Sequence, residues 1–401
     1  MRTGTTPTIV TRAVPTGQIA EAADLPPLLE RIYLSRGLTH AQELDRNLSA
    51  LAHPESLPDV DKAAARLAAA VMGGEHILIV GDFDADGATS VALAVSLLEA
   101  MGAERVSFLV PNRFEFGYGL SPEIVELALA ENPQVIVTVD NGTSSIEGVE
   151  RANAAAVDVI VTDHHLPGKS LPETFALVNP TLTGSAFESR AMAGVGVIYY
   201  VLGAVRAQLK TAGWFAARPI PNLADWLDLV AVGTIADVVP LDRNNRVLVS
   251  QGIRRIRAGR ARPGIRALCE VAGRRMERLS AQDLGFAIGP RLNAAGRLDD
   301  MTLGIQCLLA SDLNQARDLA TALDELNRAR RALEQEMVQD AELIVASHDQ
   351  SVDGRFGVAV YDASWHQGVV GIVAGRLREK IHRPVIAFAE AGDAAPDELK
   401  G

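Results

Sequence analysis

Acidic and imidazole side chains gather directly after several apolar segments of this sequence. They are Asp82, Asp84, Asp86, Asp140, Asp163, His164, His165 and Asp237. Carboxylate oxygens with imidazole nitrogen, and no thiolate, suit a hard divalent ion such as Mn²⁺ or Mg²⁺ better than structural zinc. An aspartate shared between two ions holds them ~3.5–4 Å apart, the spacing used to hydrolyse phosphate esters. Asp140 is our candidate for that shared residue.

The apolar segments are predicted to be strands of a parallel sheet. Four β-branched runs cover Ile77–Val80, Val106–Val110, Val135–Val139 and Val157–Val161. Helical patterns lie between them, at Thr89–Met101 and from Ser121-Pro122-Glu123 to Ala130. This alternation indicates repeated βαβ units, in which all strands end at one edge of the sheet. The acidic loops are therefore expected to converge, with Asp237 arriving from the end of an apolar helix, Trp226–Val232.

The second half of the chain predicts a long helix and a second α/β unit. A narrow apolar stripe indicates one helix from Ser311 to about Val345, long enough to connect two domains. Beyond it we expect a strand at Phe356–Tyr361, a helix through Gly371–Lys380 and a strand at Val385–Phe388. The predicted fold class is α/β, with a parallel-sheet domain linked by the long helix to a smaller α/β domain. Residues 1–60 are predicted to form an N-terminal helical extension, 61–310 the catalytic domain, 311–346 the connecting helix and 347–401 a partial second domain.

Composition excludes several classes of protein. The chain is 48% hydrophobic and 22% charged, which is typical of a globular protein, and no apolar run reaches the roughly 18 residues of a membrane span. Two cysteines without CxxC spacing indicate a reducing compartment, so we expect a cytoplasmic protein without membrane contact. The net charge of −12 argues against a surface that binds nucleic acid all over.

One segment departs from this acidic balance. Arg243–Arg278 holds eleven arginines, no lysine and two acids. Such a charge run is usually a solvated helical face whose arginines pair with acids elsewhere. Arginine without lysine favours phosphate binding instead, because the guanidinium group binds phosphate through two parallel hydrogen bonds.

Each acidic loop also has an alternative interpretation. Asp82, Asp84 and Asp86 resemble the start of a calcium-binding EF-hand loop, but Leu93 stands where that loop needs glutamate, which excludes calcium. Asp84-Ala85-Asp86 also resembles the nucleophile motif of haloacid-dehalogenase phosphatases, a minor competitor because Ala88 replaces its Thr or Val. Taken singly, Asp140-Asn141-Gly142 is a turn, and the other acids are helix caps. Their joint occurrence on one predicted edge favours a site.

The acidic loops together resemble the four motifs of the DHH phosphoesterase superfamily. The motifs are Asp84-Ala85-Asp86-Gly87, Asp140-Asn141-Gly142, Asp163-His164-His165 and Gly233-Thr234-Ile235-Ala236-Asp237. Further segments resemble the RecJ single-strand-specific 5′→3′ DNA exonucleases. These segments are Val80–Ser90, Pro111-Asn112-Arg113-Phe114, Gly117-Tyr118-Gly119-Leu120, Arg291-Leu292-Asn293-Ala294-Ala295-Gly296-Arg297 and 365–374. The resemblance implies a DHH domain at 61–310 and part of a DHHA1-like domain at 347–401.

The resemblance also implies roles for individual residues. The implied metal set, for two Mn²⁺ or Mg²⁺ ions, is Asp82, Asp84, Asp86, Asp140, His164 and Asp237. The implied catalytic residues are Asp140, His164, His165 and Arg291. The implied substrate-binding residues are Arg113, Tyr118, Asn141, His165, Arg291, Arg297 and His366.

The resemblance implies hydrolysis of single-stranded DNA to 5′-mononucleotides in DNA repair and recombination. A helicase or a single-strand-binding protein is an expected partner. One alternative is a DHH phosphoesterase for pyrophosphate, oligoribonucleotides or a cyclic dinucleotide; another is a non-catalytic replication scaffold. RecJ-like proteins usually continue past the Leu-Lys-Gly segment into an oligonucleotide-binding barrel. The sequence given ends at Gly401, so we expect a fragment or a short member, with altered strand affinity.

Overall fold

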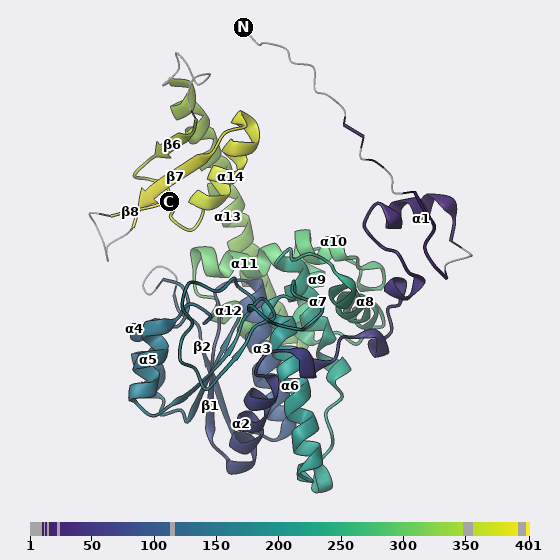
Figure 1. The fold of residues 1–401 in the computed structure, drawn as a ribbon. Coiled ribbons are helices and arrows are strands. Elements are labelled where there is room, and N and C mark those ends of the chain that lie inside the picture. Colours follow the sequence, from purple (N-terminus) through teal and green to yellow (C-terminus); the bar gives the residue numbers. More distant parts are fainter. Residues whose placement is uncertain are drawn as a thin grey trace.

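A parallel sheet lies at the centre of the larger part of the computed structural model (Figure 1). The structure describes residues 10–11, 13, 16–21, 25–112, 117–347, 356–391 and 398–401. The strands are β1 (His76–Val80), β2 (Arg105–Leu109), β3 (Val135–Val139), β4 (Asp158–Thr162) and β5 (Ala176–Val178). They lie in the order β2-β1-β3-β4-β5, and every pairing is parallel. All five strands therefore end at the same edge.

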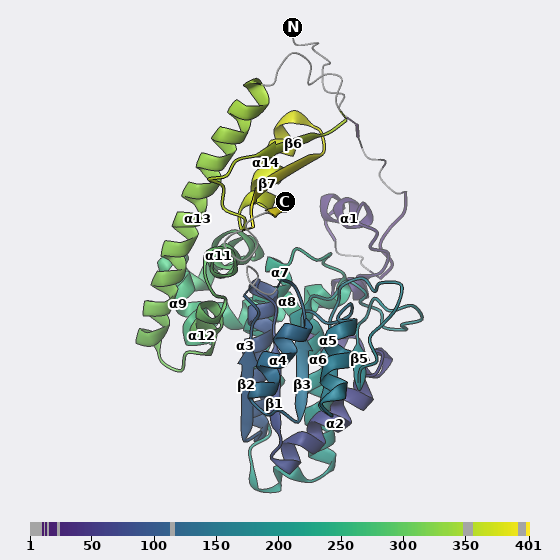
Figure 2. The same ribbon diagram turned by 90° about the vertical axis from the view of Figure 1, so that its left-hand side faces the viewer.

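Helices cover both faces of this sheet (Figure 2). The helices α2 (Val60–Gly73), α3 (Ala85–Met101) and α6 (Gly194–Thr211) pack on one face, and α4 (Pro122–Ala130) and α5 (Ile146–Ala154) on the other. Successive side chains of β1 enter different cores: Ile77 and Ile79 pack with α3, whereas Leu78 and Val80 pack with α4. Because both faces are buried, these strands are continuous apolar runs rather than alternating patterns.

The remainder of the larger part is helical. It comprises α7 (Leu227–Ala236), α8 (Arg243–Arg257), α9 (Pro263–Val271), α10 (Ala281–Asp283), the π-helix η7 (Leu284–Ile288), α11 (Gly289–Leu298) and α12 (Thr302–Leu309). The N-terminal segment contributes α1 (Pro27–Leu34) and the short 3-10 helices η1 (Ala41–Leu44), η2 (Leu48–Ala50) and η3 (Pro54–Ser56). The helix α7 is mostly apolar and almost wholly buried. Its last turn therefore lies inside the molecule, near the edge where the strands end.

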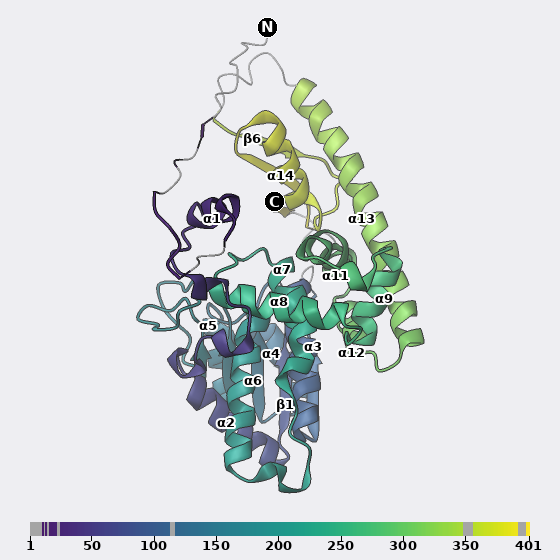
Figure 3. The same cartoon turned by 90° about the vertical axis from the view of Figure 1, so that its right-hand side faces the viewer.

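A helix of 35 residues, α13 (Leu313–Ser347), connects the two parts of the molecule (Figures 2 and 3). Its first half packs on α9, α11 and α12. Its second half places Met337 and Ala341 in a separate apolar core with α14 (Val370–Ile381). There β6 (Val358–Tyr361) pairs in parallel with β7 (Val385–Glu390), and β7 pairs antiparallel with β8 (Leu399–Lys400).

The structure confirms the predicted α/β class, its parallel sheet and the connecting helix, while the domain boundaries stay predictions. Two local differences have clear causes. The strand β5 was not predicted, because its three residues are too few to show a pattern. The helix α3 begins at Ala85 rather than Thr89, because the Asp84 side chain accepts a hydrogen bond from Gly87 N (2.9 Å) and caps the helix there. No helix among the described residues is long and apolar enough to cross a membrane.

Candidate metal centre

Six side chains from five segments meet where the strands end. Asp82 and Asp84 follow β1, Asp86 lies in the first turn of α3, Asp140 follows β3, His164 follows β4 and Asp237 caps the C-terminus of α7. They form overlapping groups whose donor atoms lie within 4.8 Å of one another: Asp82, Asp84 and Asp140; Asp86, His164 and Asp237; and Asp140, His164 and His165. Asp140 and His164 each belong to two of these groups. Asp140 is the carboxylate among them, and a carboxylate in two groups is in the position expected of a ligand shared between two ions. The structure thus brings the whole predicted metal set together.

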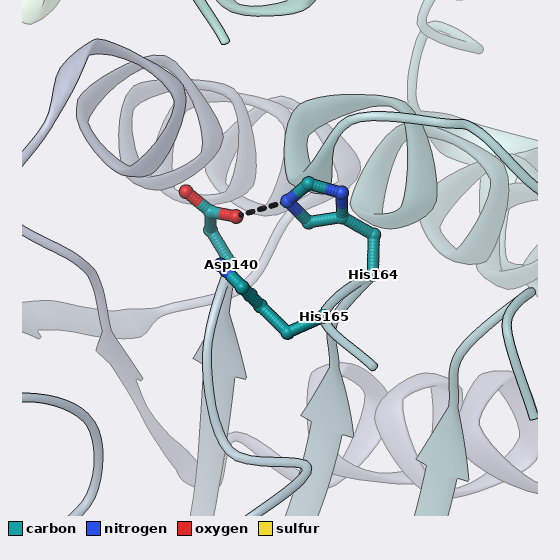
Figure 4. A group of neighbouring side chains, drawn as sticks. All are labelled: Asp140, His164 and His165. Atoms are coloured by element: carbon teal, nitrogen blue, oxygen red, sulfur yellow. Dashed lines mark ion pairs between the residues drawn. The ribbon is translucent and has the colours of Figure 1, made fainter. Parts of the chain in front are cut away.

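The His164 ring lies at the centre of three carboxylates. Its Nε2 atom is 3.0 Å from Asp140 Oδ1, and Figure 4 shows this contact. The same atom is 3.5 Å from Asp237 Oδ2 and 3.9 Å from Asp86 Oδ2. A further hydrogen bond to the backbone of Met192 orients the ring.

The residues present fit a pair of hard divalent cations. Three of the converging atoms, Asp140 Oδ1, His164 Nε2 and Asp237 Oδ2, are buried. The His164 atom lies 3.0 Å from the first oxygen and 3.5 Å from the second, but none of the three has a hydrogen-bond partner among the residues that the structure describes. Buried polar atoms without partners are rare in folded proteins, and an ion that ligates them removes their desolvation penalty. Oxygen donors with imidazole nitrogen are the ligands that Mn²⁺ and Mg²⁺ accept.

The electrostatics of the cluster also favour a bound cation. Burial raises the pKa of Asp140 well above its usual range, and the charges of Asp86 and Asp84 raise it further. Burial and the charge of Asp84 raise the pKa of Asp237 to about 7. Burial, followed by the charge of His165, lowers the pKa of His164 to about 4, so its ring is neutral at physiological pH, the form that binds metals.

A strained backbone aims Asp140 into the cluster. Asp140 has φ 63°, in the left-handed region that few residues other than glycine adopt and that Asp tolerates better than most. The start of α6 leaves room for it, because a Cβ on Gly194 would lie 2.6 Å from the Cβ of Asp140. In the same turn Gly142 has φ 114°, and a Cβ there would lie 2.5 Å from Thr138 Oγ1. A side chain at position 142 would clash with Thr138, which explains sterically why the Asp-Asn-Gly motif has glycine there.

Backbone amides hold the Asp86 carboxylate. Asp86 is wholly buried, and its oxygens accept hydrogen bonds from Gly194 N (2.6 Å) and Val195 N (3.0 Å), at the positive end of α6. On the other side, a Cβ on Gly233 of α7 would lie 2.8 Å from Asp86 Oδ1. The glycine that starts the fourth motif is thus needed for α7 to pack against this acid.

Asp163 orients His165, a role that the sequence analysis did not assign. The Asp163 carboxylate accepts hydrogen bonds from His165 Nδ1 (2.7 Å), from the amides of His164 and His165, and from Thr143 N (2.9 Å). Burial alone would raise the pKa of Asp163, but the hydrogen bond and charge of His165 lower it below its usual range. The same bond raises the pKa of His165, whose side chain is 46% exposed. His165 is therefore a fixed donor beside the metal groups.

Tyr118 lies on the other side of His165. Its hydroxyl is 3.1 Å from His165 Nδ1, and it donates to Asp140 O (3.3 Å). It lines two cavities. The first cavity has a volume of about 350 Å³ and is also lined by Ser121, Ser144 and His165. The other, of about 560 Å³, lies between the two parts of the molecule and is lined by Phe83, Arg297, Gly368 and Lys400 among others. A substrate path is available there.

The other predicted substrate residues differ in where they lie. Arg297 lines the larger cavity, and its Nη1 donates to Gly368 O (3.2 Å). His366 lies in the adjoining loop, where its Nδ1 accepts from Gly368 N (3.1 Å). Arg113 lies outside the described residues. The roles of these residues stay predictions.

Two predicted residues have partners within the protein, and their roles toward a substrate stay predictions. Arg291 forms an ion pair with Asp324 on α13 (2.7 Å) and donates to Ala287 O. Asn141 is wholly buried, and its amide donates to the carbonyl groups of Val139 (2.9 Å) and Val80 (3.2 Å), which ties β3 to β1. This placement does not favour substrate contact by Asn141.

Many arginines of the segment 243–278 pair within the protein. Arg255 pairs with Asp225 (2.8 Å), Arg262 with Asp228 (3.2 Å) and Arg274 with Asp283 (3.4 Å). Arg257 donates to Leu279 O (2.7 Å). These contacts favour the structural interpretation of the run, and phosphate binding by its remaining arginines stays a prediction.

Comparison with known proteins gives the same family as the motifs. Residues 76–234 match the family model described as the DHH family, N-terminal domain. The single-stranded-DNA-specific exonuclease RecJ of Dickeya dadantii is 54% identical over 393 residues, which cover 97% of this chain and 68% of that protein. This chain belongs to the RecJ family. The RecJ of Escherichia coli is also 54% identical, over 94% of this chain and 66% of its own length. The chain thus spans about two thirds of these relatives.

Solved RecJ structures have the same fold. A crystal structure of exonuclease RecJ bound to manganese superposes with a TM-score of 0.73 at 36% identity, covering 83% of this chain and 80% of that one. A RecJ from Thermus thermophilus in complex with Mg²⁺ gives a TM-score of 0.70 at 32% identity, over 93% of this chain and 49% of the other. The acidic and histidine groups of this RecJ family member are positioned to hold metal.

Proposed function

We propose that this chain hydrolyses phosphodiester bonds of single-stranded DNA from the 5′ end and releases 5′-mononucleotides. The observation that carries the proposal is the convergence of Asp140, His164 and Asp237, whose facing atoms are buried without hydrogen-bond partners in the described part of the chain. The donor set suits the Mn²⁺ and Mg²⁺ named for the RecJ structures. Two such ions, when bound, activate water for in-line attack and offset charge on the phosphoryl group.

The protein's own groups bind and orient the substrate around that centre. Asp82, Asp84, Asp86, Asp140, His164 and Asp237 would hold the two ions. His165, fixed by Asp163 and partly exposed, is placed to donate a hydrogen bond to a phosphate oxygen where negative charge increases. The cavity between the two parts is lined by Arg297 of α11 and by Tyr118. From the second unit, His366 is hydrogen-bonded to Gly368, which also lines this cavity.

Shape is the proposed source of strand selectivity. The cavity between the two parts of the molecule is about 560 Å³, within the range of a site for one small ligand. A single strand can thread one nucleotide at a time into such a space, whereas a duplex is about twice as wide. A helicase or a single-strand-binding protein would then supply the unpaired strand, which makes either a proposed partner.

Digestion of end-labelled DNA tests this function. We expect Mn²⁺-dependent release of mononucleotides from the 5′ end of a single strand, and little cleavage of a blunt duplex, pyrophosphate or a cyclic dinucleotide. Equal cleavage of single and double strands would contradict the proposed selectivity. Preferential cleavage of pyrophosphate or the cyclic dinucleotide would favour a small-substrate phosphoesterase instead.

Replacing the shared ligand tests the centre itself. Asp140→Ala removes a carboxylate that belongs to two ligand groups, so the rate should fall at least ~1,000-fold while the fold persists. The matched control is Asp318→Ala, which removes an exposed acid on α13 and should keep the full rate. Steady-state rates and circular dichroism of both variants make the comparison. Full activity of Asp140→Ala would overturn the proposed centre.

A further inference from the structure

The helix α11 packs directly against the loop that carries three of the acids. Asn293, on this helix, accepts a hydrogen bond through Oδ1 from Ala85 N at 2.7 Å. Three residues later, Gly296 lies so close to the loop that a Cβ would be 1.8 Å from Phe83 O. At its end, Arg297 donates to Gly368 O in the second unit (3.2 Å). The same helix therefore touches the acidic loop and the second unit.

The Asn293 hydrogen bond acts at the first residue of α3. The amides of the first turn of a helix have no partner within the helix, and Ala85 is only 1% exposed. Asp84 Oδ1 accepts a hydrogen bond from Gly87 N at 2.9 Å, and Asn293 Oδ1 accepts one from Ala85 N. Without Asn293, the buried amide would need another acceptor, and the nearest carboxylates, Asp84 and Asp86, are the ones in the metal groups.

An amide is the right side chain for this task. Its carbonyl oxygen accepts the bond without adding charge, whereas an aspartate at position 293 would add another carboxylate beside Asp82, Asp84 and Asp86. Five acids already meet in this region, and like charges that close repel one another in a buried site.

We propose that Asn293 is a positioning residue of the metal centre. It satisfies the amide of Ala85 and so leaves the carboxylates of Asp84 and Asp86 directed at the cations. Outer hydrogen-bond partners of metal-binding residues typically change metal affinity or activity by about 10- to 100-fold when removed. The inference rests on the proposed function for its kinetic consequence, but not for its effect on metal affinity.

Two substitutions separate the hydrogen bond from the charge. Asn293→Ala removes the acceptor, so the Kd for Mn²⁺, measured by calorimetry without DNA, should rise at least ~10-fold. Asn293→Asp keeps the acceptor and adds a charge, so the Kd should stay equal or fall, while the melting temperature without metal falls. The control is Gln134→Ala. It removes the same kind of hydrogen bond, which His76 N donates to Gln134 Oε1 (2.8 Å) at the opposite end of β1. This substitution should leave the Kd for Mn²⁺ unchanged.

Kinetics on single-stranded DNA complete the test. For Asn293→Ala we expect a lower kcat with little change in KM, because the residue does not touch substrate. Three results would each overturn the proposal. The first is wild-type Mn²⁺ affinity in Asn293→Ala, and the second is an equal loss of Mn²⁺ affinity in Asn293→Asp and Asn293→Ala. The third is a kinetic change that affects KM alone. If the wild-type chain binds Mn²⁺ but does not cut DNA, the proposed function alone fails, and the calorimetric comparison still decides the role of Asn293.

Discussion

Asp163 accepts four hydrogen bonds, two of them from the backbone of the histidines that follow it. The negative charge of Asp163 also strengthens the hydrogen bond that His165 Nδ1 donates to it, and this bond orients the His165 ring. Asp163→Asn keeps the size of the side chain but removes the charge, so we expect kcat on single-stranded DNA to fall about 100-fold, the typical contribution of one preorganised hydrogen-bond donor. The Kd for Mn²⁺ should change less than kcat does, because Asp163 contributes no atom of its own to the ligand groups.

The matched control for this change lies at the other end of the same strand. Asp158→Asn is the same substitution at the start of β4, where Asp158, whose side chain is 40% exposed, pairs with Arg66. It should leave kcat near the wild-type value. If Asp163→Asn lost Mn²⁺ binding as well as kcat, Asp163 would support the whole metal centre and not His165 alone.

At the residue level, the sequence predicted chemical types better than roles. The acids and His164 were found because each follows an apolar run, and parallel strands bring such positions together. The role of Asp163 was missed because it depends on hydrogen-bond direction, which residue order does not give. The Tyr118 contact with His165 spans 47 positions and exists only in the fold.

Gly296 shows how closely one element must approach another at this site. Gly296→Ala would place a Cβ 1.8 Å from Phe83 O, so α11 must move away from the acidic loop. We expect a loss of about 1–3 kcal/mol in unfolding free energy, as for other overpacked sites, and weaker Mn²⁺ binding. Denaturant unfolding and calorimetry measure both.

The control for Gly296 is a glycine with open space around it. A Cβ on Gly375, in the middle of α14, would meet no atom within 4 Å. Gly375→Ala should therefore be neutral or stabilise the protein by roughly 0.5–1 kcal/mol through helix propensity. Equal destabilisation by the two substitutions would contradict the steric argument.

Among the elements, those with a strong local pattern were predictable. Long β-branched runs gave β1 to β4, and the stripe of apolar residues gave α13 to within two residues of its ends. The strand β5 is held mainly by pairing with β4 and by the Asp59 carboxylate, which accepts from Leu177 N (3.0 Å). Such long-range partners leave no signal in a stretch of three residues.

At the scale of the whole molecule, one cavity lies between the two parts. The larger part has a core on each face of its sheet, and α13 carries Met337 into the separate core of the second unit. The cavity is lined by residues of both parts. The domain arrangement followed from the order of elements. The contact of Arg297 with Gly368, which joins the two parts beside the cavity, required the fold.

The stability of the whole molecule should depend on metal and on pH together. Burial and the charge of Asp84 raise the pKa of Asp237 from 3.8 to about 7, and the raised pKa values of Asp86 and Asp140 act in the same direction. In the unfolded chain these acids ionise near their ordinary values, so the folded, metal-free protein binds more protons. Their contribution to stability is therefore complete below about pH 4 and is lost as the pH rises through about 7.

We therefore expect the chelated protein to melt at a lower temperature at about pH 8 than at about pH 6. Mn²⁺ should restore more stability at the higher pH, because ions compete there with fewer protons. Scanning calorimetry with and without chelator measures both differences. Asp237→Asn removes one ionising acid and should reduce the fall between the two pH values. An unchanged or higher melting temperature of the chelated wild-type protein at the higher pH would mean that these acids do not repel one another as their burial and spacing require.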